Sequence, residues 1–107
     1  MKGWIPGLCL VLAAGSQALA SSQSHRAHGA AVFAANGCGH CHTINKVGGH
    51  KGPELSGVGR VMSKTKIREQ ILHGGNEMPP FTDDLGAVEV NDLVAYLRSC
   101  RQKPIKK

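Results

Sequence analysis

The chain has 107 residues, with 13 Lys and Arg against 7 Asp and Glu, which gives a formal net charge of +6. This length excludes a multidomain enzyme, and the composition, 19% charged and 41% hydrophobic, excludes a disordered chain or a protein with several membrane spans. Only 4% of the residues are aromatic, so a domain this small needs something besides its side chains to fill its centre.

Residues 1–20 have the features of a secretory signal peptide. Lys2 precedes an uncharged stretch whose apolar centre is residues 5–14, and the stretch ends in the A-x-A form of a signal-peptidase site at Ala20. We therefore expect an exported mature domain over residues 21–107. The alternative is a leader that is not cleaved and remains as a membrane anchor, although Pro, Gly, Ser and Gln dilute the apolar run that a spanning helix needs.

The first half of the mature chain is predicted to hold one helix and one long loop. Residues 21–27 are polar and are expected to fray. A helix is predicted over residues 28–36, because its alanines favour helix, and the following Gly37 ends it. Residues 43–60 contain so many Gly and Pro residues that we expect a loop without regular structure.

The second half is predicted to hold two more helices. One covers residues 63–72, with Ser63 as its N-cap, and the other covers residues 87–100, which carry an apolar stripe at i, i+3, i+4 and i+7. No run alternates clearly enough to predict a strand. The predicted class is all-α, with three to four short helices and long loops, a core over about residues 28–100 and a flexible basic tail over 101–107.

The most informative motif is Cys-Gly-His-Cys-His at residues 38–42, the C-x-x-C-H pattern of covalent haem attachment. Thiols at Cys38 and Cys41 can add to the two vinyl groups of one haem, and His42 then lies under the iron as the proximal ligand. Zinc would need four ligands, a thioredoxin-type redox pair would need a βαβ context, and a structural disulfide would leave His42 without a role. We therefore expect one covalently attached haem c.

Met78 is the best candidate for the distal axial ligand. It lies in an irregular loop, residues 74–81, in which two prolines stiffen the chain, and a methionine there makes an unusual core residue. Thioether sulfur is a suitable sixth ligand for haem iron. Met62 is the rival sulfur, and His50 or His73 would give ligation by two histidines.

Together these residues resemble a class I (mitochondrial-type) bacterial monohaem cytochrome c, over about residues 28–100. The resemblance implies the cytochrome c fold, with helices and long loops wrapped around one haem. It rests on four stretches of the chain: Cys38-Gly39-His40-Cys41-His42, Gly52-Pro53-Glu54-Leu55, Met78-Pro79-Pro80-Phe81 and Tyr96-Leu97.

The resemblance also implies a partner for the proximal ligand. In that family the proline carbonyl of the G-P-x-L stretch accepts a hydrogen bond from the proximal histidine, so Pro53 would do this for His42 and fix its ring. The mature chain lacks the tryptophan that the family often places near the haem propionates. Lys51 and Arg60 are the candidates for that role.

A second implication concerns the packing of the first helix on the last. The family crosses these helices through a glycine and an aromatic residue, so Gly29 and Phe33 would meet Leu93 and Tyr96 in a contact that serves folding. Cys100 is additional to the pattern. It falls on the apolar stripe, where we expect it to pack as a small hydrophobe; the alternatives are a reactive thiol or an intermolecular disulfide.

These features predict a one-electron carrier that is not an enzyme. With both axial positions filled, the iron cycles between Fe(II) and Fe(III) and has no open site for oxygen, peroxide or a substrate. One alternative is a haem-based sensor of small ligands or a peroxidase-like protein with an open iron site. Another is the haem subunit of a larger periplasmic oxidoreductase.

The basic charge predicts the kind of partner. Lys and Arg residues can steer the chain toward redox proteins with acidic docking surfaces, whereas nothing indicates nucleic-acid binding, because no aromatic residues interleave with the lysines. We expect a monomer in the periplasm or another exported compartment, without a membrane span once the leader is removed.

Overall fold

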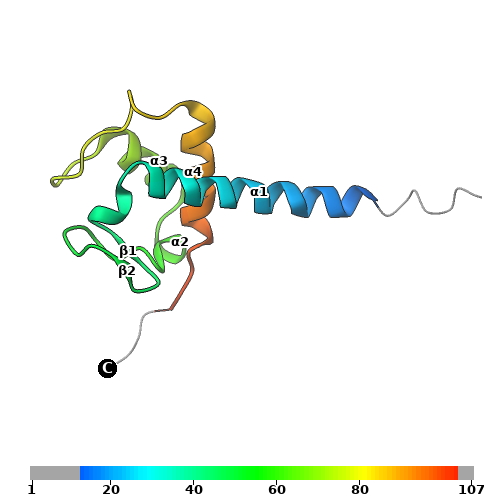
Figure 1. The fold of residues 1–107 in the computed structure, drawn as a ribbon, viewed down its shortest axis with the longest axis horizontal. Helices are drawn as coiled ribbons and strands as arrows, with labels where there is room; N and C mark the ends of the chain where they lie inside the picture. Colours follow the sequence, from blue (N-terminus) through cyan, green and yellow to red (C-terminus); the bar gives the residue numbers. More distant parts are fainter. Residues whose placement is uncertain (1–12, 104–107) are drawn as a thin grey trace, which may run out of the picture.

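The computed structural model describes residues 13–103, with side chains described from Ser21 onward, so residues 1–12 of the predicted leader and 104–107 of the predicted tail lie outside the described residues. The first helix, α1, spans Ala13–Ala35 and extends well away from the rest of the domain (Figure 1). Its C-terminal part is the helix predicted over residues 28–36. The prediction that residues 21–27 fray was wrong, because hydrogen bonds to Asp92 anchor this segment.

After α1 the chain makes two tight turns. Gly37, at φ 73°, ends the helix and leads into a short 3-10 helix, η2, over Cys38–His40. The next strands, β1 (Thr43–Ile44) and β2 (Val47–Gly48), pair antiparallel as a hairpin, whose turn residues Asn45 and Lys46 have positive φ. Sequence alternation cannot reveal a ladder of two residues per strand, so the prediction of no strand was wrong here.

Three further helices follow. The short α2 (Val58–Val61) lies inside the segment predicted to be a loop, and its four residues are too few to show a helical period. The other two predicted helices are confirmed within one residue: α3 spans Lys64–His73, with the Ser63 hydroxyl accepting a hydrogen bond from the Lys66 amide, and α4 spans Ala87–Ser99. The all-α class is therefore confirmed.

The crossing of α1 and α4 is the main helix contact of the fold (Figure 1). Gly29 is buried at this crossing, and a Cβ atom there would overlap the backbone carbonyl of Asp92. Phe33 and Tyr96 meet edge to face, with ring centroids 5.9 Å apart. The predicted contact is confirmed for these residues, and Leu93, only 1% exposed, lies in the core beneath them.

The core continues from this crossing toward α3. Cys100 is half-buried and packs against the core, as predicted, and its thiol donates to the Tyr96 carbonyl oxygen at 3.4 Å. Burial raises the pKa of this thiol. The buried apolar residues are Val32, Ile44, Val58, Ile67, Ile71, Leu85, Val90, Leu93, Val94 and Leu97.

Among the described residues, no helix combines the length and the hydropathy needed to span a membrane.

Candidate functional site

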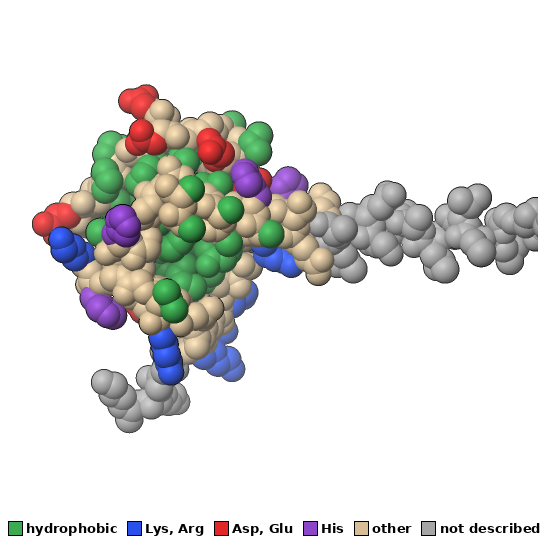
Figure 2. All heavy atoms as spheres, viewed as in Figure 1, with side chains coloured by type: hydrophobic (Ala, Val, Ile, Leu, Met, Phe, Trp, Pro, Cys, Tyr) green, Lys and Arg blue, Asp and Glu red, His purple; other side chains and the backbone are tan. Residues whose placement is uncertain are grey.

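A cavity of about 1980 Å³ opens on one face of the domain. On that face, hydrophobic side chains line a hollow (Figure 2). The segment from η2 to α2 forms one wall of the cavity, and α3 with the loop after it forms the other. The structure brings all five predicted site residues into its lining: Cys38, Cys41, His42, Pro53 and Met78.

The two cysteines are held by a single turn of chain. The backbone amides of Cys41 and His42 both donate to the carbonyl oxygen of Cys38, at 3.2 and 3.0 Å. The structure pairs neither cysteine in a disulfide. Burial raises the pKa of the Cys38 thiol, whereas Cys41 is exposed at the cavity. The turn therefore presents two thiols and the following imidazole to one space.

The His42 ring is fixed from behind. Its Nδ1 atom lies 2.7 Å from the carbonyl oxygen of Pro53, the bond that the resemblance implied. Because a carbonyl oxygen can only accept, Nδ1 carries the proton and Nε2 keeps a lone pair, which is the tautomer that a metal ligand needs. Gly52 lets the chain pass close to the ring, since a Cβ atom there would lie 2.7 Å from Cε1 of His42.

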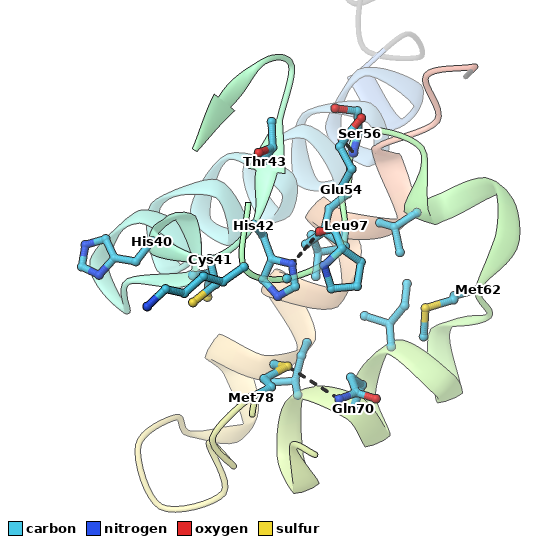
Figure 3. A pocket seen from close by; sticks show the side chains of 18 of the residues that line it. His40, Cys41, His42, Thr43, Glu54, Ser56, Met62, Gln70, Met78 and Leu97 are labelled. Atoms are coloured by element: carbon cyan, nitrogen blue, oxygen red, sulfur yellow. Dashed lines mark hydrogen bonds between the residues drawn. The ribbon is translucent and has the colours of Figure 1, made fainter. Parts of the chain in front are cut away.

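Met78 lies on the opposite wall. His42 and Met78 point toward the space between the two walls (Figure 3). The Met78 loop is a tight turn in which the backbone groups of Gly75 and Met78 exchange hydrogen bonds at 2.9 and 3.0 Å, while Asn76 and Glu77 have positive φ. This turn half-buries the thioether against the core and directs it into the cavity.

The rival ligands lie in different places. Met62 and His50 also line the cavity, but His73 does not, and it pairs instead with Glu69 at 2.9 Å, one turn away on α3. The Thr43 hydroxyl donates to the backbone carbonyl of Gly49, next to His50. The geometry therefore separates His73 from the other candidates.

Charged residues of both signs line the cavity rim, three lysines and two glutamates. Lys51, one of the two candidates for a propionate partner, lines the cavity with Lys46 and Lys103, whereas Arg60 is not among the lining residues. Glu54 and Glu77 also line it, and hydrogen bonds from Ser56 lower the pKa of the Glu54 carboxyl group.

Sequence reasoning missed one residue that contacts the candidate ligands. Gln70 on α3 places its side-chain amide next to the Met78 sulfur (Figure 3). A single glutamine on the exposed face of a helix gives no signal in a sequence, because only the folded loop brings the sulfur to it.

The chemistry of these donors fits a haem. Two thiols, one imidazole nitrogen and one thioether face an apolar cavity, and imidazole and thioether are the ligands that haem iron takes in cytochromes c. The apolar part of the lining includes Leu55, Phe81 and Leu97. Within residues 13–103, no group of three or more His, Cys, Asp or Glu side chains is placed to hold a metal ion.

An all-α fold that gathers a C-x-x-C-H motif and a methionine around one apolar cavity defines a c-type cytochrome. The chain belongs to the family described as cytochrome c oxidase, cbb3-type, subunit III, whose model matches residues 25–97. No curated protein and no solved structure matches it significantly. The predicted c-type cytochrome is thus confirmed at the level of the family, and the family supports a haem-based electron carrier.

Proposed function

We propose that this chain is an exported one-electron carrier with a single haem c. Thioether bonds from Cys38 and Cys41 would hold the haem, and His42 and Met78 would be its axial ligands. The observation that carries this proposal is the position of His42 and Met78 on opposite walls of one cavity, with the His42 ring fixed by Pro53. The bound haem would supply the Fe(II)/Fe(III) couple.

The residues around this site have three tasks. Pro53 orients His42 and makes its Nε2 a better donor, because its carbonyl accepts the Nδ1 proton. The apolar residues of the lining would keep water from a bound haem, and the resulting low local dielectric would raise the free energy of the charged ferric form. Met78 would hold the iron from the other wall, so no site would be left for a substrate, and the protein would transfer electrons without acting as an enzyme.

A second candidate function follows from the name of the family. Subunit III of a cbb3-type cytochrome c oxidase is a part of a larger complex, so this chain could be a haem subunit that stays docked to one partner. The two readings differ in their response to salt. If charge attracts a free carrier to its partner, the rate of their encounter falls as ionic strength rises, whereas a permanent subunit remains bound.

The charge distribution supports an acidic partner for the cavity rim. Six of the seven acidic residues lie within residues 69–92, a segment without Lys or Arg, and every Lys and Arg lies outside it. In the view of Figure 2, most acidic side chains lie above the hollow and most Lys and Arg side chains lie below it. We infer that a redox partner would bring an acidic surface to the rim lysines, Lys46, Lys51 and Lys103.

The export of the chain belongs to the same proposal. The A-x-A site at Ala20 predicts a mature protein that starts at Ser21, in the periplasm or an equivalent compartment. The mass of the protein recovered from the periplasm of a bacterial host tests this prediction. A mass equal to that of a chain that begins at Ser21 and carries one haem would support it, and a full-length chain in the membrane fraction would overturn it.

An optical spectrum of the matured protein tests the ligands. We expect sharp low-spin c-type bands after reduction and the weak Met–Fe(III) charge-transfer band in the oxidised form. A high-spin spectrum that changes on addition of carbon monoxide would contradict Met78 ligation and favour the sensor or peroxidase-like alternative. A chain without covalent haem, when it is expressed with a cytochrome c maturation system, would contradict the roles of Cys38 and Cys41.

A further inference from the structure

Gln70 connects the end of α3 to the sulfur of Met78. Its side-chain nitrogen Nε2 lies 3.2 Å from the carbonyl oxygen of Gly74 and 3.7 Å from Sδ of Met78 (Figure 3). The carboxamide carries two hydrogens on this nitrogen, so it can make both bonds at once. Gln70 therefore links the C-terminus of the helix, the start of the loop and the candidate ligand.

The bond to sulfur restricts how Met78 can bind a metal. A thioether sulfur has two lone pairs and is a weak acceptor. When the amide of Gln70 occupies one lone pair, the other is left for an iron, and the rotation of the side chain is limited. The long, unbranched methionine side chain otherwise has three rotatable bonds and adapts easily to its surroundings.

We propose that Gln70 is the positioning residue for the axial methionine: its amide holds the Met78 sulfur and selects the lone pair that faces the iron. This inference rests on the proposed His42 and Met78 ligation. Gln70 acts through Met78 and does not itself touch the haem iron. Its effect is to keep the sixth ligand in place against small molecules that compete for the same coordination position.

The rest of the loop is tied to α3 at other points. The Phe81 amide donates to the Ile71 carbonyl oxygen at 3.1 Å, and the Thr82 hydroxyl donates to the Leu72 carbonyl oxygen at 2.6 Å. Neither bond involves the sulfur. Among the described residues, the hydrogen bond that reaches Sδ comes from Gln70. Thr82 therefore offers a control that loosens the loop without changing the sulfur contact.

The test compares Gln70→Leu with Thr82→Val in the haem-loaded protein as it is recovered after export. Imidazole is titrated against the oxidised protein, and the loss of the Met–Fe(III) charge-transfer band reports displacement of Met78. Loss of one modest hydrogen bond should let imidazole bind about fivefold more tightly to Gln70→Leu and should shift the band before titration. For Thr82→Val we expect lower thermal stability, an unshifted band and an imidazole affinity close to that of the wild type.

Each outcome decides between two readings. If both variants change the imidazole affinity equally, Gln70 acts only by stabilising the loop, and the inference is wrong. The same conclusion follows if Gln70→Leu leaves the affinity and the band unchanged while the wild type shows the band. A wild-type protein without the band would instead overturn the proposed ligation, and the role of Gln70 with it. Gln70 is exposed in the cavity wall, so we expect its leucine variant to fold.

Discussion

Nδ1 of His28 on α1 lies 2.7 Å from a carboxylate oxygen of Asp92 on α4, and it donates a hydrogen bond across the crossing of the two helices. His25, one turn earlier, donates to the other carboxylate oxygen at 2.6 Å. The Asp92 side chain is only 8% exposed, while both imidazoles are about half exposed. One buried carboxylate thus joins two turns of α1 to the middle of α4.

This arrangement predicts a pH-dependent stability. The hydrogen bond from His28 holds the pKa of Asp92 below its usual range, against the opposing effect of burial, and His25 adds to the lowering. A carboxyl group with a lowered pKa in the folded state stabilises the fold above its unfolded pKa of about 4. That stabilisation disappears as the pH falls through the lower folded pKa.

The variant Asp92→Asn measures this contribution. It should melt at a lower temperature than the wild type at pH 7, and the difference should shrink as the pH approaches 3. Asp83→Asn removes an exposed carboxylate and serves as the control, with little change in melting temperature at either pH. A difference between Asp92→Asn and the wild type that stayed constant with pH would show that the charge of Asp92 is not what stabilises the crossing.

The same crossing predicts a large effect of a single methyl group. Gly29→Ala would push a Cβ atom into the Asp92 carbonyl and to within 2.7 Å of the Tyr96 Cβ, so the helices would have to separate. We expect a loss of about 2 kcal/mol in the free energy of unfolding, measured by urea denaturation. Gly39→Ala, whose Cβ would make an ordinary 3.6 Å contact with Phe33, should cost much less. Equal losses of stability in the two variants would contradict the close approach of the helices at Gly29.

Removal of the candidate axial ligand should create a binding site. Met78→Ala leaves the iron with one protein ligand, so the reduced protein should bind carbon monoxide, which the wild type should not. Met62→Ala removes the other methionine that lines the cavity, and its spectra should match those of the wild type. Carbon monoxide binding by Met62→Ala and not by Met78→Ala would identify Met62, and not Met78, as the axial ligand.

The loop behind His42, the candidate proximal ligand, gives a fourth prediction. Gly52→Ala would place a Cβ atom 2.7 Å from Cε1 and 2.9 Å from Nδ1 of His42, which should displace the imidazole and lower the fraction of chains that carry low-spin haem. Pro53→Ala keeps the carbonyl that accepts the His42 proton, so it should retain the haem and lose only about 1 kcal/mol of stability. The ratio of haem absorbance to protein in the purified variants checks both.

Local chemistry made much of this site predictable. The spacing of residues 38–42 is the one that attachment to the two vinyl groups of a haem requires, and prolines beside Met78 mark a loop with a defined shape, so the sequence alone predicted that these residues line one cavity. The helices α3 and α4 were predictable because each is long enough to show its apolar period, and Ser63 marks the start of α3.

Contacts between distant parts of the chain were not predictable. Residues 21–27 are polar by composition, yet they are helical, because Asp92, more than 60 residues later, supplies partners for His25 and His28. The link from Gln70 to Met78 depends on a loop that turns back on its helix. The helix α2 and the β1–β2 hairpin are too short to leave a periodic pattern.

The separation of charge along the chain has a consequence for motion before contact. With six of its seven acidic residues in the segment 69–92 and all its basic residues elsewhere, the folded domain carries an electric dipole as well as a net charge. In the field of a charged partner such a molecule experiences a torque at distances comparable to the Debye length, about 8 Å at physiological salt. It therefore rotates as it approaches and arrives with one face already turned to the partner.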